Sequence, residues 1–165
     1  MPIISSLTFL HRERSGNLMA IIEKSLVLDA PIEQVWAVIA DHTRMIEWAQ
    51  MDGVIITSGE TQGVGLTCEC DFGIFTADER VIEWQENQKI VHEIIAMGMP
   101  MIETWTLEPN GNGTRFIWRQ EVNPAGIRRL MVPMIKWQMG RTFDKALENL
   151  KAVVESASLI KLSLD

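Results

Sequence analysis

The chain has 165 residues, of which 47% are hydrophobic, and its formal net charge is −7. This length suits a single domain, and the acidic balance argues against a nucleic-acid backbone or an anionic membrane surface as the main partner. No apolar run approaches the ~20 residues that a membrane span needs, so stable membrane insertion is not expected. Cys68 and Cys70 would share one face of a strand, which is poor geometry for a disulfide. A cytoplasmic, reducing location is the simplest interpretation.

The first 18 residues differ in character from the rest. A short apolar stretch precedes the charged residues 11–14, which is the reverse of the order in a signal peptide. Strand patterning begins only after Met19. We therefore predict a disordered N-terminal extension over 1–18, a ligand-binding domain over 19–158 and a C-terminal tail over 159–165. Whether Met19 is the true start of the protein or 1–18 is a genuine tail stays open.

Two short helices are predicted after the first strand. Residues 20–28 are rich in β-formers, and the following segment 30–40 has helical spacing, with Pro31 suited to its first turn. Asp41 is predicted to cap a second short helix over 42–49.

The remaining chain reads as strands followed by one long helix. Short connections between consecutive strands predict an antiparallel meander. Apolar residues recur every three or four positions over 126–157, which predicts a helix in which Pro133 produces a kink or marks the true start. About 30 residues at 1.5 Å each span roughly 45 Å, enough to cross the sheet. The six predicted strands lie at 53–58, 64–71, 74–84, 89–97, 101–108 and 114–122.

These elements predict an α+β fold of one domain. A curved seven-stranded antiparallel sheet needs a cover for its apolar face, and the long C-terminal helix is the element that can lie across it. The two short helices would follow strand 1.

Successive turns of a meander alternate between the two ends of the sheet. Three of the predicted turns are polar and would share one end, whereas those at 71–74, 97–101 and 122–127 carry apolar residues and would share the other. Apolar surface gathered at one place marks a binding site or an interface, and methionine adapts to varied shapes. We interpret this end as the mouth of a cavity; a plug of the core and a protein interface are the alternatives. The apolar residues expected there are Phe72, Ile74, Met97, Met99, Met101, Leu130, Met131, Val132, Met134 and Ile135.

Five stretches carry a resemblance to a known family. They are "LDAPIEQVWAVIADHTRMIEW", "GVGLTCEC", "ERVIEWQENQKIVHEI", "WTLEPNGNGTRFIWRQEV" and "ALENLKAVVE". In this order, over about 20–157, they resemble the SRPBCC superfamily of START/Bet v1-like helix-grip proteins, and most closely its polyketide cyclase/dehydrase and lipid-transport group. The resemblance implies a deep, mostly apolar cavity between a curved sheet and a long helix. Such proteins bind lipids, sterols, polyketides, plant hormones or other hydrophobic molecules, and some are cyclases or dehydratases.

Strand alternation indicates which side chains face the interior. The more apolar sets of 66–72, 101–107 and 116–122 are taken as inward, which brings the polar Glu103 and Gln120 inside; the two faces around His92 compete closely. The predicted ligand-binding residues are Cys68, Cys70, Phe72, Met97, Met99, Met101, Trp105, Trp118, Gln120, Met134 and Ile135.

Glu103 is the sharpest catalytic candidate, and His92 is a weaker one. A carboxyl group in an apolar pocket has a raised pKa and can serve as acid or base. The alternatives for Glu103 are a polar anchor for the ligand and an ion pair with Arg80 or Arg119. His42 is expected to have a capping or surface role.

No metal site and no cofactor are expected. The three histidines are not at ligand spacing from one another or from a cysteine, and the cysteines are interpreted as walls of the cavity. Trp137 is expected to line the cavity together with Trp105 and Trp118. The sequence therefore predicts binding of a small hydrophobic molecule that is lipid-, polyketide- or aromatic-like. The alternatives are a cyclase/dehydratase-type enzyme with an acid/base carboxylate and a protein-interaction module; monomer and homodimer both stay open.

Overall fold

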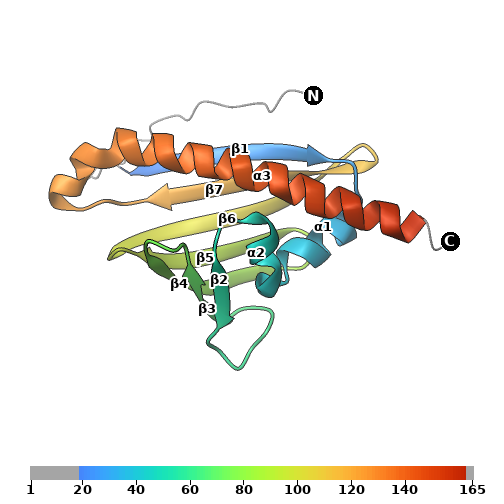
Figure 1. The fold of residues 1–165 in the computed structure, drawn as a ribbon, viewed down its shortest axis with the longest axis horizontal. Helices are drawn as coiled ribbons and strands as arrows, with labels where there is room; N and C mark the ends of the chain where they lie inside the picture. The colour runs from blue at the N-terminus through green and yellow to red at the C-terminus, as the bar shows by residue number, and fades with distance from the viewer. Residues whose placement is uncertain (1–18, 163–165) are drawn as a thin grey trace.

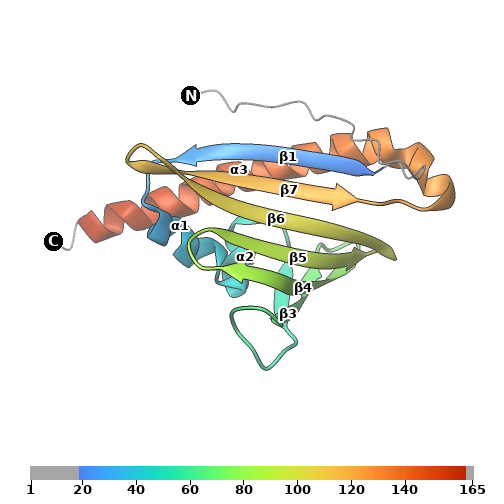
Figure 2. The same ribbon diagram turned by 180° about the vertical axis from the view of Figure 1, so that it is seen from behind.

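The computed structural model describes residues 19–162, so the predicted extension 1–18 and residues 163–165 lie outside the described part. A seven-stranded antiparallel sheet has the order β1-β7-β6-β5-β4-β3-β2. The helices lie on one face of this sheet, and α3 crosses it diagonally (Figures 1 and 2). The predicted helix-grip architecture is confirmed. The elements are β1 (Ala20–Leu28), α1 (Ile32–Ile39), η1 (His42–Arg44), α2 (Met45–Trp48), β2 (Gly53–Ile56), β3 (Thr67–Asp71), β4 (Thr76–Gln85), β5 (Lys89–Ala96), β6 (Met99–Asn110), β7 (Gly113–Val122), η2 (Gly126–Met131) and α3 (Val132–Leu162).

Local sequence accounts for where the helices begin. The carboxylate of Asp41 accepts a hydrogen bond from the backbone N–H of Thr43 at 3.0 Å, which confirms the predicted cap. Pro133 is the second residue of α3, a position where its missing N–H leaves no helical hydrogen bond unmade. Pro133 therefore marks the start of the long helix, and the preceding residues form the separate η2 turn.

The β5–β6 connection is shorter than predicted. Met97 and Gly98 both have positive φ, 51° and 69°, as in the two-residue turns that join strands of a twisted hairpin. Ala96 pairs with Met99 across this turn. Met99 and Met101 are consequently strand residues of β6. The predicted turn over 97–101, which placed both of them in a loop, is therefore too long.

Aromatic residues fill the space between the sheet and its helical cover. Trp48, Trp105 and Phe116 have no exposed surface, and Trp48 meets Trp105 edge to face with ring centroids 5.2 Å apart. Phe143 of α3 stacks on Trp118 of β7 at 4.0 Å. A void large enough for a water molecule would leave part of the surrounding side chains accessible. Since these three rings have no accessible surface, no such void adjoins them.

None of the described helices is both long enough and apolar enough to cross a membrane.

Candidate functional site

A row of polar side chains crosses the inner face of the sheet on three neighbouring strands. His92 of β5 is paired with Glu103 of β6, and Glu103 is paired with Gln120 of β7. All three are buried, since residues directly opposite one another in a sheet point to the same face. The predicted inward faces of 101–107 and 116–122 are confirmed, and of the two faces around His92 the one that carries the histidine is inward.

Glu79 of β4 extends this polar row. Its Oε1 lies 3.3 Å from His92 Nε2, and its Oε2 accepts a hydrogen bond from the Cys70 thiol at 3.6 Å. Cys68 is paired with Glu79 across the β3–β4 ladder, and its sulfur lies 3.8 Å from that of Cys70. The two cysteines are thus buried side by side next to a buried carboxyl group.

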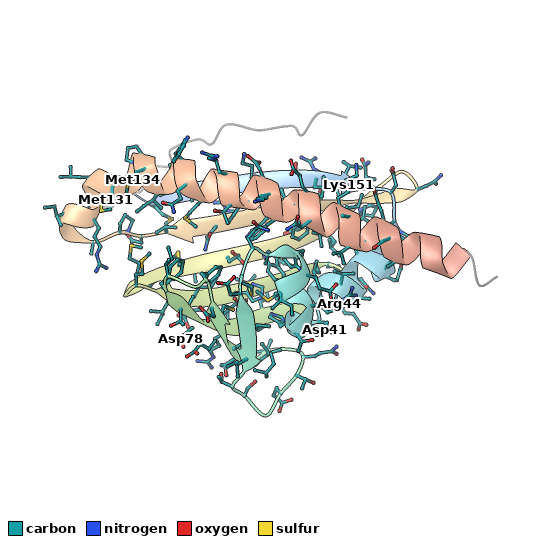
Figure 3. The ribbon with its side chains drawn as sticks, viewed as in Figure 1. Asp41, Arg44, Asp78, Met131, Met134 and Lys151 are labelled. Atoms are coloured by element: carbon teal, nitrogen blue, oxygen red, sulfur yellow. The ribbon has the colours of Figure 1, made fainter. Side chains whose placement is uncertain are left out.

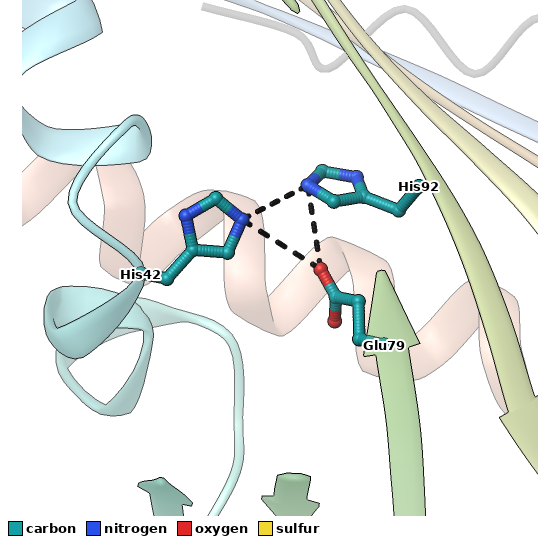
Figure 4. A group of neighbouring side chains, drawn as sticks. All are labelled: His42, Glu79 and His92. Carbon is teal, nitrogen blue, oxygen red and sulfur yellow. Dashed lines mark hydrogen bonds and ion pairs between the residues drawn. The ribbon is translucent and has the colours of Figure 1, made fainter. Parts of the chain in front are cut away.

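His42 completes the cluster from the opposite side. It lies on η1, and its Nε2 is 3.1 Å from His92 Nε2 and 3.8 Å from Glu79 Oε1 (Figure 4). Its Nδ1 donates to the carbonyl oxygen of Ala40 at 3.3 Å. The expected capping or surface role is wrong, because only 1% of His42 is exposed. The η1 turn places the imidazole over the sheet, where it stacks on Trp105.

Burial controls the protonation of these groups. It raises the pKa of Glu79 and of Glu103 to about 8, because a low-dielectric surrounding disfavours the charged carboxylate. Burial lowers the pKa of His42, and it holds the pKa of His92 well below its usual value, with the nearby His42 as a further cause. The neutral forms of all four side chains are therefore favoured near neutral pH.

Glu103 has no arginine or lysine partner within residues 19–157. Arg119, one of the two expected partners, instead contacts Glu23 at 3.3 Å and Glu121 at 2.9 Å. Arg80 is exposed on the outer face of β4. The alternative of an arginine pair is therefore wrong, because strand alternation sends both arginines to the face opposite Glu103.

A second feature is the apolar end of the sheet. The pairs Asp71–Thr76, Ala96–Met99 and Met101–Val122 bring the β3–β4 turn, the β5–β6 turn and the end of β7 to one end, as the alternation of turns predicts. The start of α3 lies at the same end (Figure 1), where Figure 3 labels Met131 and Met134. Exposed apolar side chains from these segments form what we call the apolar rim: Ile74, Met97, Ile127, Leu130, Met131, Met134 and Trp137.

A pocket of about 230 Å³ lies at the same end of the sheet, and its lining residues include chain neighbours of the rim residues Met97, Ile127 and Leu130. It is formed by the start of β6, the chain after β7 and η2, so it brings apolar groups and two guanidinium groups together. Arg129 donates to the carbonyl oxygen of Pro124 at 3.3 Å, which fixes part of the wall. Its lining residues are Gly98, Met99, Pro100, Asn123, Ala125, Arg128 and Arg129.

The residues predicted to bind a ligand are divided between these two places. At or near the rim are Met97, Met99, Met134, half-buried Ile135 and half-buried Phe72, which stacks on Phe75. Trp137 does not line the interior as expected: it lies on the solvent side of α3, is 63% exposed and has the guanidinium of Arg141 over its ring. The buried members are Cys68, Cys70, Met101, Trp105, Trp118 and Gln120, together with His92 and Glu103.

Sequence reasoning missed Glu79 and His42 as site residues. Alternation along β4 places Glu79 on the same face as the apolar Ala77 and Val81, which was an available signal. No comparable pattern marks His42, because the orientation of a three-residue turn depends on its packing.

Comparisons with known proteins agree with this architecture. A family model described as polyketide cyclase / dehydrase and lipid transport matches residues 19–155. A comparison with curated proteins found no match. Similar solved structures show the same fold at low sequence identity. XoxI from Bacillus cereus is 14% identical with a TM-score of 0.70, and 84% of this chain and 98% of that chain are covered.

Two further structures are comparable. A START superfamily protein from Mycobacterium smegmatis is 17% identical with a TM-score of 0.69, covering 84% of this chain and 99% of that one. Protein CV1439 from Chromobacterium violaceum is 23% identical with a TM-score of 0.63, covering 82% and 97%. The fold likeness and the family match over most of the sequence lead to one assignment: this chain belongs to the polyketide cyclase/dehydrase and lipid transport family.

Proposed function

We propose that the protein binds a small hydrophobic molecule, lipid-, polyketide- or aromatic-like, which enters at the apolar rim. The observation that carries the proposal is the gathering of exposed apolar side chains around a pocket at one end of the fold. Exposed apolar side chains gathered at one place mark a binding site or an interface. The family assignment supports a ligand-binding scaffold of this type.

The backbone at Met97 supports the same proposal. A left-handed conformation costs a non-glycine residue about 1–2 kcal/mol, and Met97 adopts it with φ of 51°. Asn-Gly is the preferred sequence for such a turn. A methionine that is 58% exposed at this position is therefore better explained by what its side chain contacts than by the turn itself.

The packing of the interior indicates how a ligand would be admitted. No water-sized void adjoins Trp48, Trp105 or Phe116, whereas Met101 and Trp118 keep 8% and 5% of their surface accessible, so we expect space for a ligand to widen beside these two residues and toward the rim. The η2 turn has no buried residue, and moving it away from the sheet exposes little apolar surface. We propose that η2 and the start of α3 move to admit the ligand, with Glu103 and Gln120 as polar anchors further in.

The two arginines of the pocket define the preferred ligand more closely. Arg128 and Arg129 lie beside the exposed Leu130 and Met131. Guanidinium groups bind carboxylates in bidentate geometry. A hydrophobic molecule with an anionic end group fits this combination best.

The test pairs two substitutions of exposed apolar residues. Leu130 at the rim is 80% exposed, and Val64 in the β2–β3 connection, outside the rim, is 61% exposed. L130D is expected to weaken binding of a polarity-sensitive apolar dye about tenfold, since one buried leucine contributes about 1.5–3 kcal/mol. V64D is the control and should leave dye binding unchanged. Native mass spectrometry of the purified full chain would identify any ligand that co-purifies.

Equal dye binding by L130D and V64D would contradict the proposed entrance. If the rim instead docks a protein, dye binding survives L130D.

A second candidate function is a cyclase/dehydratase-type enzyme. The row of His92, Glu103 and Gln120 favours it, because a carboxyl group with a pKa near 8 can donate a proton to a leaving hydroxyl group. The decisive comparison is between wild type and E103Q loaded with the co-purified compound. Loss of water from the compound on wild type but not on E103Q would support the enzyme; equal recovery of unchanged compound would leave binding as the function.

A further inference from the structure

Three ligand atoms of the buried cluster converge on one point. His42 Nε2, His92 Nε2 and Glu79 Oε1 are separated by 3.1, 3.3 and 3.8 Å, and Figure 4 shows all three facing the space between them. A triangle with these sides has a point about 2.0 Å from every corner, which is the length of Zn–N and Zn–O bonds in proteins. A metal ion would therefore fit with little rearrangement.

The hydrogen-bonding inventory points the same way. The Ala40 carbonyl can only accept, so Nδ1 of His42 carries the hydrogen and the neutral ring presents a lone pair at Nε2. Glu79 Oε1 has no hydrogen-bond partner among the described residues, and neither has His92 Nδ1. In the metal-free protein the lone pair of His42 Nε2 requires His92 to carry its hydrogen on Nε2 and to donate it across the 3.1 Å contact. Because His92 Nδ1 has no other partner in the described part of the chain, this hydrogen can move to Nδ1 when an ion takes its place, and Nε2 then becomes a third donor atom.

Neighbouring groups hold the side chains in place. The carbonyl of Ala40 orients His42, a support that metal-binding histidines almost always have. The Cys70 thiol contacts the other oxygen of Glu79 at 3.6 Å, which leaves Oε1 directed toward the two histidines. The three side chains come from η1, β4 and β5, so a shared ion would also join the short helices to the sheet.

We propose that His42, Glu79 and His92 bind one divalent transition-metal ion, with Zn²⁺ as the best match to two imidazoles and one carboxylate. The ion would lie inside the fold, next to Trp105, whose ring is near both histidine rings. The nearby Cys68, Cys70 and Glu79 form an overlapping group of possible ligands. The Cys70 thiol is already engaged with the other oxygen of Glu79, whereas Glu79 Oε1 and the two imidazole nitrogens face one another directly. The histidine group is therefore the favoured one.

The first test measures zinc affinity of the full-length protein after chelator treatment, in competition with a chromophoric chelator. Wild type should bind one equivalent of Zn²⁺. H42N and E79Q should each bind at least about tenfold more weakly, because each removes a ligand. E83Q is the control: it is the same substitution on the same strand, at a surface glutamate that pairs with Lys89, and it should change affinity less than about threefold. Far-UV circular dichroism of the metal-free variants establishes that they are folded.

A second measurement needs no substitution of a ligand. Co²⁺ bound by wild type should give the visible bands of a four- or five-coordinate site without the intense near-ultraviolet bands of thiolate ligation, and C68S/C70S should bind with unchanged stoichiometry. Three results would overturn the proposal: no stoichiometric binding by wild type, thiolate bands on Co²⁺, or binding that survives E79Q and is lost in C68S/C70S. If wild type binds no stoichiometric Zn²⁺, the three side chains form a hydrogen-bonded cluster that shares protons and holds no metal.

Discussion

His42 and His92 face each other with their Nε2 atoms 3.1 Å apart, although one lies on a three-residue turn and the other in the middle of the sheet. Both are fully buried. Their contact joins the layer of short helices to the sheet through polar atoms inside a largely apolar core. Each ring depends on the other, because within the described residues His92 has few further polar neighbours.

This relationship predicts non-additive stability effects in metal-free protein. H42L and H92L should each lower the free energy of unfolding by about 1–3 kcal/mol, since each removes a buried hydrogen-bond partner of the other ring. The double variant should lose about 0.5–3 kcal/mol less than the sum of the single losses. Urea denaturation in the presence of a chelator measures all three. Strict additivity would mean that the two rings do not interact energetically.

The stack of Phe143 on Trp118 should dominate the attachment of α3 to the sheet. F143A removes a buried ring 4.0 Å from its partner and should destabilise the protein by about 3–5 kcal/mol. W137A, on the exposed side of the same helix, should change stability by no more than about 0.5 kcal/mol. Thermal and urea unfolding distinguish the two. Similar losses from both variants would show that the face of α3 is misassigned.

Two glycines predict opposite effects of the same substitution. A Cβ at Gly113 would meet the backbone carbonyl of Leu28, whereas a Cβ at Gly140 in α3 would meet nothing within 4 Å. G113A should therefore destabilise by about 1–3 kcal/mol, because the β1 backbone has to shift. G140A should stabilise by about 0.5–1 kcal/mol through helix propensity. Differential scanning calorimetry measures whether each substitution lowers or raises the unfolding temperature. A higher unfolding temperature for G113A would contradict the close packing of the β6–β7 turn on β1.

The turn at Met97 should separate stability from binding. M97N places a residue that tolerates positive φ in front of Gly98, so the unfolding midpoint should be unchanged or raised. The same change removes apolar surface from the rim, so binding of an apolar dye should weaken. A midpoint that falls while dye affinity stays constant would show that the methionine serves the packing of the turn instead.

Much of the fold follows from local patterns that the sequence displays directly. Successive residues of a strand point to opposite faces, and this pattern assigned Met101, Glu103 and Trp105 to the interior. Successive turns of a meander lie at opposite ends of the sheet, and this pattern assigned the apolar connections to one end. Both patterns depend only on neighbouring residues, which is why they hold. The β5–β6 turn was too long in the prediction because Met97 adopts a conformation that methionine rarely takes.

The cluster of His42, Glu79 and His92 could not be predicted in the same way. It depends on the register of β4 against β5 and on how η1 packs over the sheet, and both are properties of the assembled molecule. Trp137 was placed inside because of its apolar ring, although it lies off the helical face that Ile135, Met139 and Phe143 define, and it is 63% exposed.

The pairing of β1 with β7 has a consequence for synthesis. The first strand of the sheet finds its partner only after all the other strands exist, and the cover of α3 follows later still (Figure 1). Throughout that interval the face carrying Trp105 and Trp118 is open to water. Long-range pairing of this kind folds slowly, and uncovered apolar sheet surface aggregates readily. A chain truncated before α3 should therefore accumulate as insoluble material or bound to chaperones, so the synthesis of α3 determines whether the nascent sheet stays in solution.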